Sequence, residues 1–141
     1  MEAKQLREHT WAIRIARGER LVSSLEDFCQ QKDIAGGFFF GVGAVGFVEL
    51  AHYDVGEKNY QSQEFEEPLE LVSLEGSIGC KKDSLIVHAH AVLSRPDMET
   101  IGGHLVEGVV SGTAEIYLIT SSPLEKEPDE ITGLDLFSFS S

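Results

Sequence analysis

The sequence has little positive charge. Its 141 residues include 11 lysine and arginine side chains against 24 aspartate and glutamate side chains, a formal net charge of −13 with histidine counted as neutral. Nucleic-acid binding depends mainly on Lys and Arg side chains that replace counterions on the phosphates, so this balance argues against a DNA-binding or RNA-binding surface. Positive charge is concentrated only in short groups without interleaved aromatic residues: Arg14, Arg17 and Arg20, and Lys81 with Lys82.

Cysteine is also scarce, and long apolar runs are missing. Cys29 and Cys80 lie far apart and form no C-x-x-C pair, a usage typical of two buried thiols in a reducing compartment. The first ten residues, "MEAKQLREHT", contain charges and no apolar stretch, and nowhere do 18 apolar residues run together. We therefore expect no secretion signal and no membrane span, and we expect the protein to be cytoplasmic.

What is present is the composition of a folded domain. Apolar residues make up 42% of the chain and charged residues 25%, close to the averages of globular proteins. A chain of this length buries about two thirds of the surface that its unfolded form exposes, and no linker or repeat divides it. We therefore expect a single domain that spans residues 1–141.

The hydrophobic periodicity predicts one principal helix. Residues 10–16, "TWAIRIA", alternate in the two-residue period of a strand. The period then changes, and five apolar side chains fall on one helical face: Leu21, Val22, Leu25, Phe28 and Cys29. This spacing predicts an amphipathic helix that covers one face of a sheet and ends before Gly36 and Gly37.

Strands are predicted for nearly all of the chain after the helix. The predicted segments are 38–54, 60–67, 69–80, 83–94, 108–122 and 132–140. Turn-forming pieces separate them, among them "SRPDMETIGG" at 94–103, and we expect the charged run "LEKEPDE" at 124–130 to form a solvated loop. Because no helix lies between successive strands, the pattern favours an α+β fold, mainly an antiparallel β-sheet with one principal amphipathic helix.

Three of the five histidines occur in one apolar segment, residues 84–105. His88 and His90 are two residues apart on a predicted strand and therefore share one face. Such positions are about 6.6 to 6.8 Å apart, a span that two imidazoles can close to reach one ion at about 2.0 to 2.1 Å. His104 follows Gly102 and Gly103, and its separation of fourteen residues from His90 suits a turn that reverses the chain and brings it beside the same strand.

This arrangement leaves two interpretations open. Three histidines on one face, with a fourth position for water or substrate, are typical of a catalytic zinc site, although nickel, iron and copper also accept imidazole. The alternative is that each histidine packs in a half-buried strand and donates a hydrogen bond to a backbone carbonyl. The local pattern alone does not decide between them.

Other side chains are weaker candidates for a role at such a site. Glu49 and Glu115 are carboxylates on predicted strands that would serve as general acid or base only if they faced the metal; the ordinary alternative is that they face solvent. His52 is either a neighbour of the site or unrelated to it, and we expect His9 to be solvated. No Ser/His/Asp or Cys/His arrangement is recognisable, so catalytic residues are not predicted.

Four segments together form a family pattern. They are "GGFFFGVGAVGFVELAHYD" at 36–54, "LELVSLEGSIG" at 69–79, "HAHAVLS" at 88–94 and "IGGHLVEGVVSGTAEIYLI" at 101–119. The combination of H-x-H with G-G-H-L, in this order and spacing, is the specific part. In these segments the chain resembles the PPC (plants and prokaryotes conserved) domain family, over nearly its whole length and in the stand-alone prokaryotic form.

The resemblance implies an assembly and a cofactor. It implies a homotrimer of α+β subunits and, as in prokaryotic members, a metal held by three histidines, commonly zinc or otherwise another divalent transition metal. Carried over by position, the ligands are His88, His90 and His104. The implied function is that of a binding or regulatory module, with a small-molecule ligand at the metal.

The resemblance also bears on DNA binding and on catalysis. Plant relatives join this domain to an AT-hook that enters the minor groove, but the nearest string here, "ARGERL" at 16–21, has Glu where the hook needs Arg. With this departure and a net charge of −13, we do not expect direct DNA binding, although relatives inherit that label. The alternative function is a metal-dependent lyase or hydrolase acting on a small molecule, because the subunit fold also resembles that of acetolactate decarboxylase, a zinc enzyme.

Overall fold

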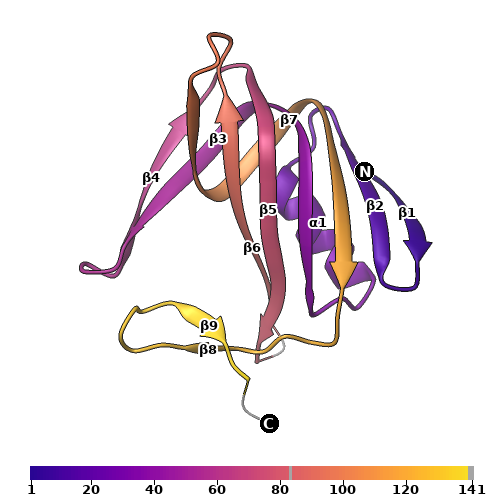
Figure 1. Cartoon of the computed structure of the whole chain (residues 1–141), viewed down its shortest axis with the longest axis vertical. Helices are drawn as coiled ribbons and strands as arrows, with labels where there is room; N and C mark the ends of the chain where they lie inside the picture. The colour runs from indigo at the N-terminus through magenta and orange to yellow at the C-terminus, as the bar shows by residue number, and fades with distance from the viewer. Residues whose placement is uncertain (83, 140–141) are drawn as a thin grey trace.

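The computed structural model describes residues 1–82 and 84–139, and within them it contains one helix and nine strands (Figure 1). In chain order these are β1 (Glu2–Arg7), β2 (Thr10–Ala16), α1 (Leu21–Gln31), β3 (Gly37–Asp54), β4 (Asn59–Phe65), β5 (Leu69–Lys81), β6 (Ser84–Ser94), β7 (Thr100–Thr120), β8 (Lys126–Pro128) and β9 (Asp135–Phe137). The predicted α+β fold, mainly antiparallel with one principal helix, is confirmed. Asp83 and Ser140, at the ends of two predicted strands, lie outside the described residues.

Seven of the strands form one antiparallel sheet in the order β1-β2-β7-β6-β5-β3-β4. The first half of β3 pairs with β5 and β7, and its second half pairs with β4 and β7. Because β3 pairs with β7 as well as with β5, the strands β3, β5, β6 and β7 form a closed ring of pairings. Register shifts along β3 mark bulges, which bend a strand and allow it to pair with different neighbours along its length.

The helix packs against β6 and β7, and Figure 1 shows it behind the strands. All five apolar side chains of its predicted face are buried: Leu21, Val22, Leu25, Phe28 and Cys29. The ring of Phe28 packs edge-on against Trp11 of β2, with centroids 5.2 Å apart. This apolar face of α1 therefore closes the core that the inward side chains of the sheet form. No helix among the described residues has the length and hydropathy needed to cross a bilayer.

A carboxylate from the sheet caps the start of the helix. Glu107 of β7 is only 6% exposed, and its oxygens accept hydrogen bonds from the backbone N–H groups of Val22 at 2.8 Å and Ser23 at 3.2 Å. The hydroxyl of Ser23 donates a further bond at 2.6 Å, and the Arg20 guanidinium lies at 3.3 Å. The first N–H groups of a helix have no partner within it, so this contact joins α1 to β7.

Replacing this carboxylate should lower stability in a pH-dependent way. Burial raises the pKa of Glu107, but hydrogen bonds from Ser23, Gly108 and Val22 outweigh it, and its pKa lies below the ordinary value of 4.5. The stabilisation is therefore complete above about pH 4.5 and is lost as the pH falls through the folded pKa. Urea unfolding of Glu107→Gln at pH 7 should give a free energy of unfolding about 2 kcal/mol below that of the wild type.

The difference in free energy of unfolding between the wild type and Glu107→Gln should decrease as the pH is lowered below about 4.5. The other charged groups beside Glu107 are Arg20, which keeps its charge over this range, and Glu26, whose pKa is raised first by burial and then by Glu107 itself. Glu115→Gln, an exposed carboxylate on the same strand, is the matched control and should change stability by less than about 0.5 kcal/mol. Equal stabilities of the wild type and Glu107→Gln at pH 7 would contradict the capping role.

One error of sequence interpretation concerns the start of β7. The sequence predicts a turn at 94–103 and a strand from residue 108, whereas β7 begins at Thr100 and includes Gly102 and Gly103. These glycines are needed inside the strand because a Cβ at Gly102 would lie 2.7 Å from the Ala91 carbonyl oxygen, and one at Gly103 would lie 2.9 Å from that of Ala51. The glycines permit close pairing of strands here and do not form the expected turn.

The ends of the chain also differ from prediction. β1 was not predicted, because its six residues are all exposed and carry no apolar alternation. The run 124–130 is not wholly a solvated loop, since it contains β8, in which Lys126 is buried. The final strand is shorter than the predicted 132–140, because β9 pairs only along Asp135–Phe137.

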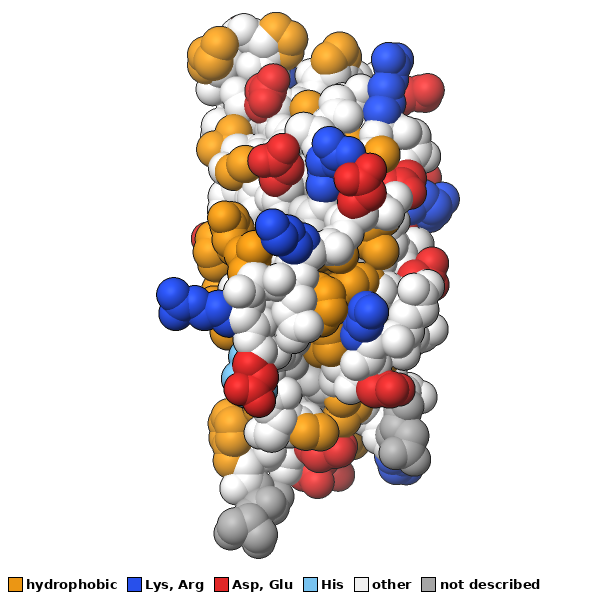
Figure 2. Space-filling view, turned by 90° about the vertical axis from the view of Figure 1, so that its right-hand side faces the viewer, with side chains coloured by type: hydrophobic (Ala, Val, Ile, Leu, Met, Phe, Trp, Pro, Cys, Tyr) orange, Lys and Arg blue, Asp and Glu red, His pale blue; other side chains and the backbone are white. Residues whose placement is uncertain are grey.

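The surface on the β1 and β2 side carries charges of both signs. Figure 2 shows Lys and Arg side chains interspersed with Asp and Glu side chains across this face. Arg14 of β2 is paired with Glu2 of β1 at 2.8 Å. Positive charge is therefore not gathered into one patch on this side of the molecule.

Candidate metal centre

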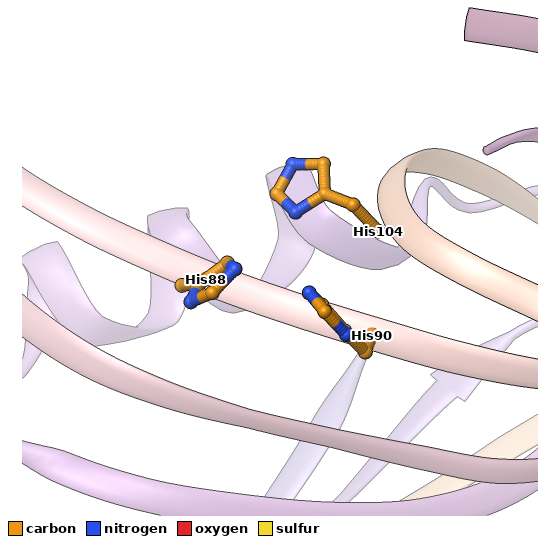
Figure 3. A group of neighbouring side chains, drawn as sticks. All are labelled: His88, His90 and His104. Carbon is orange, nitrogen blue, oxygen red and sulfur yellow. The ribbon is translucent and has the colours of Figure 1, made fainter. Parts of the chain in front are cut away.

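Three imidazoles lie together at the junction of β6 and β7. His88 and His90 project from β6, and His104 lies opposite His90 in the register of the β6–β7 pair. The ring centroids are 5.0 Å apart for His88 and His90, 5.1 Å for His88 and His104, and 5.6 Å for His90 and His104. Figure 3 shows the three rings around one space, and a ligand nitrogen from each ring lies within 4.8 Å of those of the other two.

The alternation of β6 explains why two histidines face this way. Ala89, Ala91 and Leu93 are buried in the core, so His88 and His90 must project from the opposite side of the strand. The predicted common face is thus confirmed. The predicted reversal of the chain that brings His104 beside the same strand is also confirmed, since β6 and β7 pair antiparallel and His104 lies opposite His90. The turn is shorter than predicted, because β7 already begins at Thr100.

Burial and neighbouring charges lower the pKa of two of the three rings, His88 and His104. Burial lowers the pKa of His88 to about 4, helped by the nearby charges of His104, His90 and Lys126. The pKa of His104 is lowered in the same way, first by burial and then by His90. A neutral imidazole has a lone pair on one ring nitrogen, which is the form that binds a metal ion.

The hydrogen bonding of the three rings fits a metal better than simple packing. Nδ1 of His104 is buried without a hydrogen-bond partner, and among the described residues neither His88 nor His90 forms a hydrogen bond with its ring. Buried polar atoms nearly always have a partner, so an orphaned nitrogen calls for one. Nitrogens at about 2.1 Å from one tetrahedral ion are about 3.4 Å apart, so binding an ion would require side-chain rotations that draw the three rings closer together.

The rings open into a pocket of about 830 Å³. One wall is aromatic: Tyr60 packs on the His104 ring at a centroid distance of 4.8 Å, and Tyr53 packs on Tyr60 at 4.8 Å. A second wall is the β8–β9 hairpin, which contributes Lys126, Asp135 and Phe137 among others. The hydroxyl of Tyr53 donates a hydrogen bond to the carbonyl of Thr132 at 2.7 Å, which joins the two walls.

The remaining sequence candidates have different positions. His52 lines the pocket, whereas Glu49, which is half-buried, and Glu115, which is exposed, do not line it. His9 is solvated as predicted, with 68% of its side chain exposed. The two carboxylates are therefore not placed to act as acid or base at the histidines.

Sequence reasoning missed several side chains of the pocket. Tyr53, Tyr60, Lys126 and Asp135 all line it. Tyr53 follows His52 on the predicted strand 38–54, and its position beside a candidate histidine was the signal that could have identified it. Nothing in the charged run 124–130 distinguishes Lys126 from a solvated lysine.

Comparison with protein families matches residues 2–122 to the Plants and Prokaryotes Conserved (PCC) domain. The chain belongs to this family. The resemblance of the H-x-H and G-G-H-L segments to the PPC domain is therefore confirmed. The match ends before β8 and β9, so the hairpin wall of the pocket lies beyond the residues matched to the PPC domain.

Solved structures agree with this assignment. A PPC protein of Pyrococcus horikoshii is 30% identical, with 94% of this chain and 92% of that chain covered and a TM-score of 0.85. A metal-containing protein of Archaeoglobus fulgidus is 31% identical, with 96% and 99% covered and a TM-score of 0.85. A Bacteroides thetaiotaomicron protein provisionally described as DNA-binding is 25% identical, with 98% and 96% covered and a TM-score of 0.94. Among curated proteins there is no significant match.

The metal-containing relative and the three imidazoles together suggest a metal for this PPC protein. Neither observation specifies which metal. The suggestion agrees with the chemistry of the donor set, since neutral imidazoles suit zinc, copper, iron and nickel.

Proposed function

We propose that this PPC protein binds one divalent transition-metal ion per subunit, zinc being the expected ion, through His88, His90 and His104. The observation that carries the proposal is the group of three imidazoles whose ligand nitrogens lie within 4.8 Å of one another, together with the buried Nδ1 of His104 that has no hydrogen-bond partner. A bound ion would supply a Lewis acid able to bind an oxygen or nitrogen atom of a small molecule. The protein then acts as a binding or regulatory module with a ligand in the pocket.

The residues around the triad have roles of their own in this proposal. Tyr60 packs on the His104 ring and limits its rotation. The pocket around the rings is lined by apolar side chains from β6 and from the β8–β9 hairpin, among them Ile86 and Leu136, which reduce access of water. Elemental analysis of the purified protein, beside a variant that lacks His88 and His90, tests the proposal; a wild type with less than about 0.1 metal per subunit after purification in zinc-containing buffer contradicts it.

We further propose that three subunits associate through an exposed apolar face of the sheet. This face consists of alternate residues on the first half of β3 and the last part of β7: Phe38, Phe40, Val42, Tyr117 and Ile119, each between 43% and 55% exposed. Register pairs Phe38 with Ile119 and Phe40 with Tyr117, and the rings of Phe40 and Tyr117 stack at 5.6 Å. A continuous apolar patch of this kind is typical of an interface between subunits. The expected number of three subunits comes from the resemblance to the PPC family, which implies a homotrimer.

Direct binding to DNA is not part of this proposal. The Bacteroides relative has that provisional description, but here the net charge is −13 and the few basic groups are partly compensated. Arg14 pairs with Glu2 at 2.8 Å, Arg20 lies 3.3 Å from Glu107, and Lys81 pairs with Asp135 at 2.6 Å. These pairs reduce the positive potential available to phosphates.

A fluorescence anisotropy titration with a 20-base-pair duplex of A·T-rich sequence checks this expectation. We expect no saturable binding with up to about 10 μM protein at about 50 mM salt, where phosphate contacts are strongest. The acidic surface provides no set of lysines and arginines to release counterions. Saturable binding that weakens steeply as salt rises would contradict the expectation and support the DNA-binding description.

The alternative function is a metal-dependent lyase or hydrolase acting on a small molecule. The observation that favours it is the pocket of about 830 Å³ that opens on the triad, large enough for a substrate. Against it, the described carboxylate in the pocket, Asp135, is already paired with Lys81. Metal-dependent turnover of a 2-oxo or 2-hydroxy acid that disappears in the variant lacking His88 and His90 would favour the enzyme over the module.

A further inference from the structure

The pocket contains a lysine, Lys126, that is not one of the proposed metal ligands. Lys126 of β8 is 7% exposed, and its side chain lines the same pocket as the three histidines. Its stem passes over Gly79 of β5, where a Cβ would lie 3.2 Å from Lys126 Cε, so the absence of a side chain at residue 79 makes room for it. Its ammonium group lies 4.7 Å from the centre of the Phe137 ring.

This ammonium has no hydrogen-bond acceptor among the described residues. The carboxylate on the neighbouring strand, Asp135, instead forms an ion pair with Lys81 at 2.6 Å. A charge largely withdrawn from water without a hydrogen-bonded partner is costly, and the cation–π contact with Phe137 offsets only part of that cost. Consistent with this, burial lowers the pKa of Lys126, although Asp135 acts in the opposite direction.

The positive charge of Lys126 also acts electrostatically on His88. It is one of the causes that lower the pKa of His88, after burial and the other two imidazoles. Because Asp135 is paired with Lys81, the ammonium of Lys126 is a local positive charge in the pocket of a chain whose overall charge is −13. The overall field disfavours polyanions such as nucleotides, while the local charge favours a ligand with one negative charge.

We propose that the pocket binds a small organic monoanion, its single carboxylate held by the Lys126 ammonium beside the metal and its apolar body packed against Phe137, Leu136 and Ile86. This inference rests on the proposed metal site, which it deepens by naming the class of ligand. Most of the residues proposed to contact this ligand lie on the β8–β9 hairpin, outside the segment matched to the PPC domain.

The test compares a carboxylate with its neutral isostere. Zinc-loaded wild type is titrated with 3-phenylpropionate and with 3-phenylpropanamide, and binding is followed by protein-observed NMR. We expect the amide to bind about tenfold more weakly, because it cannot form the charge-assisted hydrogen bond to Lys126. Lys126→Met, which keeps the length of the side chain, should lose about tenfold in affinity for the carboxylate and keep its affinity for the amide.

Two further variants sharpen the comparison. Lys126→Arg restores the positive charge and should retain most of the affinity for the carboxylate. Lys4→Met removes an exposed charge from β1, far from the lining of the pocket, and should leave both affinities unchanged, which controls for the net charge of the protein. Circular dichroism establishes that each variant is folded, and the carboxylate-to-amide ratio of the wild type decides the question if Lys126→Met does not fold.

Different results would contradict the proposed carboxylate binding by Lys126 and the proposed metal binding by the three histidines. If 3-phenylpropionate does not bind the wild type at up to about 10 mM, or if wild type and Lys126→Met bind it equally, the inference is overturned while the metal content is untouched. If the wild type binds no metal, the proposed function fails, and a tenfold loss of carboxylate affinity in metal-free Lys126→Met would still support a role for the lysine.

Discussion

The double variant His88→Ala, His90→Ala should purify with less than a tenth of the metal bound by the wild type. Changing a residue that merely orients a ligand weakens metal binding by about 10- to 100-fold, so removing two of three ligands should cost more than that. Elemental analysis after dialysis against buffer without metal, together with competition against a zinc-binding dye, measures the loss. The side chains of both histidines lie on the side of β6 away from the core, so the variant should fold.

His52→Ala is the matched control for this experiment. His52 lines the same pocket but is not one of the three clustered imidazoles, so its removal should leave the metal content at the wild-type level. Full metal content in the double variant would mean that the ion binds elsewhere, and the ligand assignment would then be wrong. Equal losses in the control and in the double variant would point to a general disturbance of the pocket.

Phe40→Asp should convert the proposed trimer into a monomer. The substitution places a charge at the centre of the apolar face, where Phe40 stacks on Tyr117 at 5.6 Å. Burying an unpaired carboxylate in an interface costs several kcal/mol, which is enough to shift association at micromolar concentration by about 100-fold or more. Size-exclusion chromatography with light scattering should give three times the subunit mass of 15.5 kDa for the wild type and the subunit mass for the variant.

Met98→Asp provides the comparison for this variant. Met98 is 76% exposed in the turn between β6 and β7 and is not part of the apolar face, so its replacement should leave the trimer intact. A wild type that elutes as a monomer at micromolar concentration would contradict the homotrimer outright. A Phe40→Asp variant that remains trimeric would instead place the interface on another surface.

Local periodicity predicts the parts of this fold in which one face alone is buried. β2 and α1 have such faces, and both were predicted, the strand with its observed bounds and the helix with all five of its buried side chains. The common face of His88 and His90 follows from the same alternation. Sequence reasoning was less successful where pairing between distant segments decides the structure.

Three features illustrate that limit. β7 extends back through Gly102 and Gly103 because the chain approaches Ala91 and Ala51 closely there, and glycines that permit such an approach look like turn residues in sequence. β1 has no buried face, and it is held to β2 by backbone pairing and an exposed ion pair between Glu2 and Arg14, which leave no apolar alternation in its sequence. Lys126 is buried by a hairpin that packs against other elements, a long-range effect that its charged neighbours conceal.

The position of β7 in the sheet has a consequence for the dynamics of the site. This strand pairs with β2, β3 and β6, and it carries both His104 and the Glu107 that caps α1. Amide protons on a strand with partners along both edges exchange with solvent only when much of the molecule opens. We therefore expect the amide protons around His104 to exchange slowly, and we expect little of the binding free energy to be spent in ordering its backbone when an ion or a ligand binds.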